Sequence, residues 1–239
     1  MKELGARAVL QELRMNVLSN NLANINTSGF KEDAVAFRIP SQGFAGSSNE
    51  KWIMDPYQTA ATRIQMEQGQ LRETGNPLDL SIHGNGFFCI NTASGEEYTR
   101  NGSFTVDGQG RLVTPEGFPV LGRQGQEIRL DAGFVHVDDA GNITVDGVPS
   151  GRLRIVQPDD PGLLRKSADT RFSLPEDAVL VEMENPVVKQ GFLESSNVNS
   201  IRAMTDMIEV LRGYETYHKI IHVLNEANQK SINEVGRLK

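Results

Sequence analysis

Apolar residues recur on one face of a predicted helix near the start of the chain. Spacings of four and three residues separate the positions of this stripe, which are Leu4, Ala8, Gln11, Met15, Leu18, Leu22 and Ile25. Such spacing is the pattern of an amphipathic α-helix. We therefore predict a helix over residues 2–26, followed by Gly29 in the left-handed conformation that caps a helix C-terminus.

A second stripe of the same kind lies near the end of the chain. Its members are Ile201, Met204, Ile208, Leu211, Tyr214, His218, Ile221 and Leu224, and Asn197 or Asn199 can cap its start. The pattern predicts a helix over residues 198–238, roughly 60 Å long at 1.5 Å per residue. An apolar stripe of that length has to be covered. We expect the first helix and neighbouring subunits to cover it.

Between the helices the pattern changes to short alternating runs that glycine turns separate. Four turn signals of the kind that joins antiparallel strands fall in this region: Asn101-Gly102, Asp107-Gly108, Glu116-Gly117 and Asp146-Gly147. An internal echo relates residues 106–112 to 137–143, and residues 116–119 to 146–149. Two copies are too few for a solenoid, so the echo predicts paired hairpins of one β domain.

These elements predict an α+β fold that is mainly β by area. The long N- and C-terminal helices are expected to form a coiled-coil-like pair, with an antiparallel β domain inserted between them. The predicted domains are a discontinuous terminal helical domain (1–33 and 194–239), an extended linker with a few strands (34–75) and a β-rich outer domain (76–193). Within the linker, residues 41–49 have the composition of an exposed connector.

Composition and charge exclude several classes of function. The net charge of -7 argues against nucleic acid, because phosphate binding needs clustered lysine and arginine. No apolar run approaches the ~20 residues of a membrane-spanning helix, so no membrane insertion is expected. Arg14 interrupts the first apolar stretch, so we expect no cleaved secretory signal.

The residues that could carry chemistry have simpler interpretations. Gly84-Asn85-Gly86 lacks the third glycine of a nucleotide loop and predicts a tight turn. His218 and His222 have a spacing that can bind zinc, but no partner motif accompanies them, so an ordinary helix face is preferred. Cys89 lies among apolar residues and is interpreted as a buried small side chain. We expect no enzyme activity, no cofactor and no metal site.

Asparagines are concentrated where the first helix should end. Asn20, Asn21 and Asn24 stand beside Leu22 and Ile25, although asparagine is a poor helix former. A buried amide has to be paired, at a cost of about 1–3 kcal/mol when it is not, so these amides can select one register and one set of neighbours. The alternative is a frayed, solvated helix end.

Three segments in this order resemble the flagellar basal-body rod protein family, which builds the axial rod and hook. They are residues 20–31, residues 69–88 with 98–104 close behind, and residues 191–199 leading into Arg212-Gly213-Tyr214-Glu215. Together they span nearly the whole chain. The short connector before Gly69 makes the chain most similar to the proximal-rod subtype.

The resemblance implies a structural subunit that self-assembles through its terminal helices into the axial drive shaft of the bacterial flagellum. In this family the helices pack around a central channel and the β domain lies outside. The implied partners are other axial rod subunits, the same and different, the flagellar type III export apparatus, and hook or ring components. The implied location is the basal body, where the rod crosses the periplasm, reached without a cleaved signal peptide. Alternatives are a distal-rod or hook protein and, from another class, a carbohydrate- or bushing-binding β module.

The same reasoning predicts which residues lie at subunit interfaces. They come from both helices and from the asparagine-rich segments that adjoin them: Leu4, Met15, Leu18, Asn20, Asn21, Leu22, Asn24, Ile25, Asn26, Gly29, Phe30, Asn197, Val198, Asn199, Ile201, Met204, Ile208, Leu211, Tyr214, Ile221 and Leu224.

Overall fold

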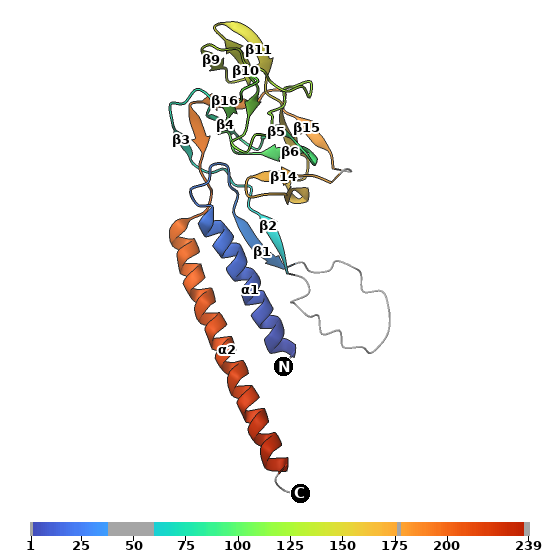
Figure 1. Cartoon of the computed structure of the whole chain (residues 1–239), viewed down its shortest axis with the longest axis vertical. Helices are drawn as coiled ribbons and strands as arrows, with labels where there is room; N and C mark the ends of the chain where they lie inside the picture. Colours follow the sequence, from blue (N-terminus) through green and yellow to red (C-terminus); the bar gives the residue numbers. More distant parts are fainter. Residues whose placement is uncertain (1, 38–59, 176–177, 237–239) are drawn as a thin grey trace. The chain divides into compact units, whose positions relative to one another are not determined.

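The computed structural model describes residues 2–37, 60–175 and 178–236 (Figure 1). It is mainly β with one helix near each end, which confirms an α+β class. The elements in chain order are α1 (Lys2–Ala23), β1 (Asp33–Phe37), β2 (Ala60–Ile64), β3 (Leu71–Glu73), β4 (Leu80–His83), β5 (Phe87–Thr92), β6 (Gly95–Thr99), β7 (Thr105–Val106), β8 (Leu112–Val113), β9 (Val135–Val137), β10 (Asn142–Val145), β11 (Val148–Arg152), β12 (Ile155–Pro158), the 3-10 helix η1 (Pro161–Leu163), β13 (Arg165–Lys166), β14 (Arg171–Ser173), β15 (Leu180–Glu182), β16 (Val187–Gln190), β17 (Phe192–Glu194) and α2 (Ser200–Gly236).

The chain divides into two compact units. The helical unit comprises Met1–Leu22, Asp33–Arg63 and Asn199–Lys239, and the β unit comprises Ala23–Glu32 and Ile64–Val198. The short segment Ala23–Glu32 thus belongs with the strands, whereas the sequence pattern groups it with the helices. The connector at residues 41–49 lies outside the described residues.

Helix α1 is shorter than the sequence predicts. It ends at Ala23 rather than at residue 26, because a turn replaces the last predicted residues. In this turn Thr27 N donates to Asn24 O at 3.1 Å and the Thr27 hydroxyl donates to Asn24 Oδ1 at 3.0 Å. Gly29 is left-handed, with φ of 72°, but it lies well beyond the end of α1 and does not cap it.

Helix α2 begins where an asparagine caps it. Asn199 Oδ1 accepts a hydrogen bond from Arg202 N at 3.1 Å, which confirms this residue as the N-cap. The helix has 37 residues, from Ser200 to Gly236, against the 198–238 predicted. At 1.5 Å per residue it is about 55 Å long. None of the described helices is long and apolar enough to cross a membrane.

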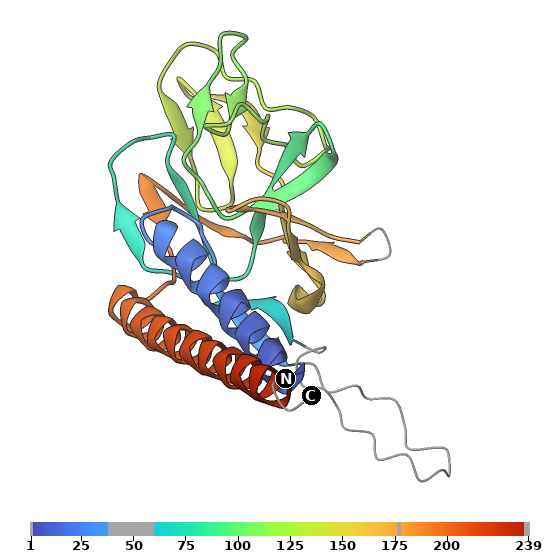
Figure 2. The same ribbon diagram turned by 60° about the horizontal axis from the view of Figure 1, so that its bottom comes forward.

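Within the helical unit, α1 and α2 lie side by side and run in opposite directions (Figures 1 and 2). At one point of approach, a Cβ placed on Gly213 of α2 would lie only 3.4 Å from Gln11 Nε2 of α1. Strands β1 and β2 form a two-stranded sheet.

The β unit is built from antiparallel pairs around two hydrophobic clusters. Its largest sheet has the strand order β13-β14-β6-β5-β12-β15, and a second has the order β11-β10-β9. Successive residues of β5 point into different clusters, because side chains alternate across a strand. Phe88 and Ile90 join the larger cluster, while Phe87 and Cys89 join the smaller one. The pairs β16-β4, β17-β3 and β7-β8 complete the unit.

The internal echo in the sequence corresponds to two loops with the same hydrogen bonds. Asp107, between β7 and β8, accepts from the backbone of Gln109 and Arg111 at 2.8 and 2.9 Å. Asp138, between β9 and β10, accepts from the backbone of Ala140 and Asn142 at 3.0 and 2.8 Å. The paired hairpins predicted from the echo are confirmed.

The turn signals differ in outcome. Asp146-Gly147 joins β10 to β11 as a two-residue hairpin, with φ of 51° and 81°, as predicted. Gly84, with φ of 97°, lies in the tight turn expected between β4 and β5. Asn101-Gly102 is a wrong prediction of a hairpin turn. Its glycine is needed for close packing, since a Cβ on Gly102 would lie 1.6 Å from Leu80 O.

Candidate assembly surface

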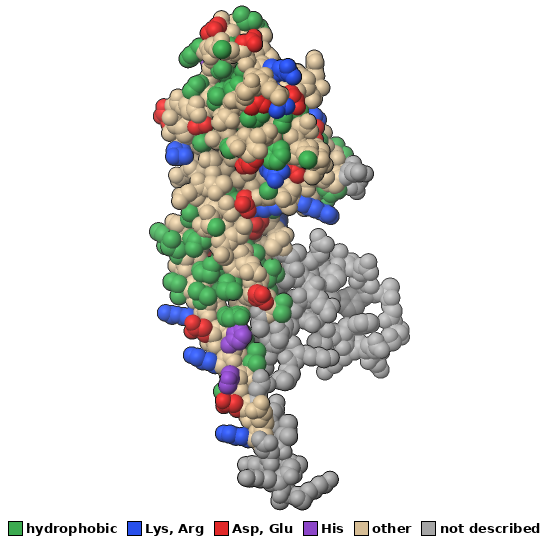
Figure 3. Space-filling view, in the orientation of Figure 1, with side chains coloured by type: hydrophobic (Ala, Val, Ile, Leu, Met, Phe, Trp, Pro, Cys, Tyr) green, Lys and Arg blue, Asp and Glu red, His purple; other side chains and the backbone are tan. Residues whose placement is uncertain are grey.

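The first half of α2 carries a row of exposed apolar side chains that we call the outer stripe. It consists of Ile201, Met204, Ile208 and Leu211, which are 78%, 52%, 54% and 43% exposed. Their spacing of three and four residues places them on one face of the helix. Figure 3 shows hydrophobic side chains gathered over this part of the helical unit. Uncovered apolar rows of this kind mark interaction surfaces.

A different face of α2 is covered within the chain. Its residues are small: Ala203 and Val210 are 5% and 8% exposed, and Gly213 lies next to Gln11 of α1. The sequence pattern did not single them out, because a search for amphipathic periodicity favours large apolar residues. The predicted stripe therefore falls mainly on the uncovered side, with Leu224 also exposed and Tyr214 and Ile221 half-buried.

The predicted positions near α1 are mostly half-buried. Met15, Leu18, Leu22 and Ile25 are of this kind, and the side chain of Leu4 lies outside the described ones. Among the α1 side chains that the structure describes, the buried apolar one is Val17, at 8% exposure, which the sequence analysis missed.

One asparagine of the signature segment fastens α1 to β1. Asn21 is 1% exposed, and its amide donates to Asp33 O at 2.8 Å while its Oδ1 accepts from Asp33 N at 2.9 Å. The amide thus pairs with the backbone as a neighbouring strand would. Its partner is in the same chain. Of the other predicted asparagines, Asn20 and Asn24 are half-buried, and Asn26 and Asn199 are exposed.

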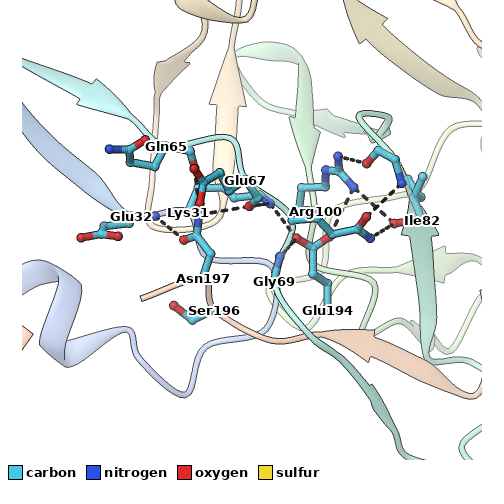
Figure 4. Close-up of polar contacts among 12 residues, drawn as sticks. Lys31, Glu32, Gln65, Glu67, Gly69, Ile82, Arg100, Glu194, Ser196 and Asn197 are labelled. Carbon is cyan, nitrogen blue, oxygen red and sulfur yellow. Dashed lines mark hydrogen bonds and ion pairs between the residues drawn. The ribbon is translucent and has the colours of Figure 1, made fainter. Parts of the chain in front are cut away.

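Asn197, just before α2, makes an analogous set of contacts inside the β unit (Figure 4). Its amide donates to Gln65 O at 2.9 Å and to Glu67 O at 3.1 Å, and its Oδ1 accepts from Glu32 N at 2.7 Å. Val198, which follows, is 8% exposed. Asn197 therefore joins three segments that are distant in the sequence.

A buried charge cluster lies at the same place, formed by Lys31, Glu194 and Arg100 (Figure 4). Lys31 Nζ lies 2.6 Å from Glu194 Oε1, and Arg100 Nη1 lies 3.3 Å from Glu194 Oε2. The three side chains are 0%, 1% and 2% exposed. One carboxylate thus serves two cations away from solvent.

Backbone groups provide further hydrogen bonds to the cluster, although Arg100 Nε is buried without a hydrogen-bond partner among the described residues. Glu194 Oε1 also accepts from Gly69 N at 3.0 Å, and Lys31 Nζ donates to Glu67 O at 2.8 Å. Arg100 donates to Ile82 O at 3.3 Å and to Gly84 O. Such partners are what makes a buried charge tolerable, since an unpaired one costs several kcal/mol.

Burial dominates the electrostatics of both cations. It lowers the pKa of Lys31, against the opposing attraction of Glu194, and nearby Arg100 lowers it further. Burial likewise lowers the pKa of Arg100, again opposed by Glu194. The cluster therefore depends on its single carboxylate.

Gly29 and Phe30 are enclosed in the β unit. Gly29 N donates to Glu194 O at 2.8 Å, and a Cβ on Gly29 would lie 2.3 Å from Asn101 N. The Phe30 ring is fully buried, with Lys166 Nζ 4.0 Å from its centroid. These two residues hold the signature segment in place within the β unit.

Comparisons with known proteins give these features a context. Three family models match the chain: "Flagella basal body rod protein" over residues 7–31, "Flagellar hook protein FlgE/F/G D1 domain" over residues 81–147, and "Flagellar basal body rod FlgEFG protein C-terminal" over residues 189–234. The flagellar basal-body rod protein FlgF of Caulobacter vibrioides is 33% identical, with 98% of this chain and 96% of the relative covered. The chain belongs to the flagellar basal-body rod protein family.

Further relatives agree with this assignment. FlgF of Escherichia coli is 35% identical over 88% of this chain and 87% of its own length, and the rod protein FlgG of Bacillus subtilis is 32% identical over 93% of each. The predicted family, most similar to its proximal-rod subtype, is confirmed. This rod protein is a structural component of the flagellar basal body.

The residues considered for chemistry have structural roles in this rod protein. The His218 ring packs against Tyr214, with centroids 4.3 Å apart, and His222 Nδ1 lies 3.4 Å from Glu226 Oε1. Among the described residues no three metal-ligating side chains come together. Cys89 is fully buried, as predicted, and burial raises the pKa of its thiol, which leaves it unreactive.

Proposed function

We propose that this rod subunit assembles through its terminal helices, and that the outer stripe of α2 is the contact with neighbouring subunits. The observation that carries the proposal is the exposure of four large apolar residues on one helix face. Full burial of each such side chain contributes about 1.5–3 kcal/mol. The free chain therefore gains from covering this face.

In the assembled state the two helices would pair in the manner of a coiled coil and pack around a central channel. The β unit, inserted between them in the sequence, would lie outside. The partners are other axial subunits, of the same and of related kinds, and the flagellar type III apparatus exports the chain. Its role is mechanical rather than catalytic. The buried polar contacts of the β unit, which rigidify a fold, support such a role.

The test replaces one residue of the outer stripe with a charge. In cells whose only copy carries Ile208→Asp, we expect loss of motility and of the rod in electron micrographs of basal bodies, because the aspartate would be desolvated in the contact. The purified variant should keep the melting temperature of the parent protein, since Ile208 is 54% exposed in the free chain.

The matched control is Thr216→Asp, which places the same charge on another exposed position of α2. Thr216 lies about 80° around the helix from Ile208. Cells with this variant should remain motile. Motile cells with intact rods for both Ile208→Asp and Met204→Asp would show that the outer stripe makes no subunit contact.

A further inference from the structure

The chain passes between its two units four times, after residues 22, 32, 63 and 198. One side chain of the β unit ties three of these crossings together. Asn197 Oδ1 accepts from Glu32 N at 2.7 Å, and the Asn197 amide donates to Gln65 O at 2.9 Å. Gln65 N in turn donates to Glu32 O at 2.8 Å. The segments that lead into β1, out of β2 and into α2 are therefore joined to one another inside the β unit.

A second layer of contacts holds the same three segments together (Figure 4). One carboxylate oxygen of Glu194 accepts from Lys31 Nζ and from Gly69 N. The Glu194 carbonyl also accepts from Gly29 N, at 2.8 Å. These contacts bring together three stretches of chain that we call the clasp: residues 29–32, 65–69 and 194–197.

The clasp lies between α2 and the strands of the β unit along the chain. A pull on α2 reaches Asn197 first, then Glu194, and only afterwards the rest of β17. Strand β17 pairs with β3 over three residues, so from its end this pair would open one residue at a time. The clasp contacts of Asn197 and Glu194 reach two other segments at once, and these contacts have to break together. They therefore protect the short strand pair behind them.

The other helix meets the same contacts from its own side. A pull on α1 reaches the clasp at Gly29, whose N–H is bonded to Glu194 O, and then at Lys31. Lys31 Nζ and Glu194 Oε1 are 2.6 Å apart, and the side chains are 0% and 1% exposed. Separating them leaves two buried charges without each other, which is strongly unfavourable. A pull on either helix is thus opposed by one shared set of contacts.

We propose that the clasp is a mechanical device, which divides a pull on either helix among three segments and so keeps the β unit closed when the rod turns under load. This inference rests on the proposed function, because the helices of an assembled subunit would be held by its neighbours and would pass force to the β unit through these segments. Contacts that only stabilised the fold would act equally against force from any direction. The clasp acts most strongly against force that enters through the helices.

Force spectroscopy of the full-length chain tests the clasp. The chain is held through cysteines introduced at exposed Thr216 of α2 and exposed Asp131 of the β unit, since the native Cys89 is buried. Forced unfolding depends on the rate of unfolding. Asn197→Ala should lower the force at which the β unit opens. Asn76→Ala, the matched control, removes two hydrogen bonds within one loop and should leave this force unchanged.

The direction of pulling provides a second control. Handles at exposed Ser94 and Asp131 load the β unit without pulling on the helices, and here Asn197→Ala should have no effect. Only folded molecules give an opening event, so a misfolded fraction does not obscure the result. An equal loss of opening force in both directions would overturn the proposal, and so would an unchanged force when α2 is pulled.

Motility under load tests the use of the clasp in cells. Asn197→Ala cells should build rods and swim in dilute medium but stop in viscous medium, where Asn76→Ala cells still swim. Normal swimming of Asn197→Ala cells in viscous medium, or a lack of rods in them, would overturn the mechanical role. Neither result bears on the outer stripe. Normal rods in both Ile208→Asp and Met204→Asp cells would instead overturn the proposed function.

Discussion

At the scale of single residues, the most consequential feature is that one carboxylate neutralises two buried cations. Glu194 pairs with Lys31 and Arg100, and the three side chains are almost fully buried. Removing the carboxylate leaves two buried positive charges without an anionic partner, whereas removing either cation leaves one ion pair. The cost of substitution should therefore be unequal across the cluster.

Glu194→Gln should destabilise the protein by about 3–5 kcal/mol, the cost of breaking a buried ion pair on one side. Lys31→Met should cost clearly less, because Glu194 keeps Arg100 as its partner. Urea unfolding followed by circular dichroism measures both. An equal loss for the two variants would contradict the shared-carboxylate arrangement.

Gly29→Ala should be among the most harmful small substitutions in the chain. It combines a left-handed backbone with a Cβ 2.3 Å from Asn101 N, so a loss of about 2–4 kcal/mol is expected. Gly75 is the matched control: it has the same φ of 72° but no atom within 4 Å of its Cβ position. Gly75→Ala should cost only about 1 kcal/mol of backbone strain. Similar unfolding free energies for the two would rule out a steric contribution.

At the scale of elements, the Asn21 side chain joins α1 to β1 by pairing with the backbone of Asp33 as a neighbouring strand would. Asn21→Asp removes the donor to Asp33 O and places a carboxylate oxygen against that carbonyl. We expect a loss of about 1–3 kcal/mol in the free energy of unfolding. Asn16→Asp, at an exposed position of the same helix, should change it by less than about 0.5 kcal/mol. Equal effects would mean that the Asn21 amide is not needed.

The twin aspartate loops predict a specific sensitivity to acid. Burial acts to raise the pKa of Asp138, but hydrogen bonds from Asn142 and the backbone outweigh it, so the pKa lies below its usual value of 3.8. The resulting stabilisation is present above pH 3.8 and is lost as the pH falls through the lowered value. The wild type should therefore lose stability relative to Asp138→Asn across this window, as measured by urea unfolding at successive pH values. A constant difference between the two proteins would contradict this.

At the scale of the whole molecule, the signature segment is shared between the two units. Asn21 and Leu22 belong to the helical unit, while Ala23–Glu32 belongs to the β unit. The reason is burial: Phe30 and Lys31 have no exposed surface and fill space among the strands. The β unit is therefore incomplete without a segment from near the start of the chain.

Truncation tests this requirement. A chain of residues 33–198 should melt roughly 10 °C below one of residues 23–198, because it lacks the Phe30 side chain and one cation of the cluster. Removing ten residues of α1 should not change the melting of the β unit. Chains of residues 13–198 and 23–198 should therefore show the same melting temperature for this unit. Calorimetry measures all three. The same melting temperature for 33–198 and 23–198 would show that the segment is dispensable.

Features that depend on local chemistry could be predicted from the order of the residues alone. Helical periodicity located both helices, the Asp146-Gly147 turn and the twin aspartate loops followed from short-range hydrogen bonding, and three motifs in order identified the family. The end of α1 was predicted wrongly because Asn24 and Thr27 form a turn. The spacing of apolar residues carries no information about the stability of such a turn. Asn101-Gly102 was misjudged because its glycine serves a packing contact with a distant strand.

Contacts between residues that are distant in the chain could not be predicted, because they depend on how the elements pack. Lys31 and Glu194 are 163 positions apart in the sequence. Each residue type is typical of a protein surface, so no local pattern identifies the two as partners in an ion pair. The same holds for the two faces of α2, since periodicity finds an apolar face but cannot say what covers it. Burial is a property of the packed assembly of elements. As a result, Lys31 is a core residue, while the outer stripe of α2 is uncovered.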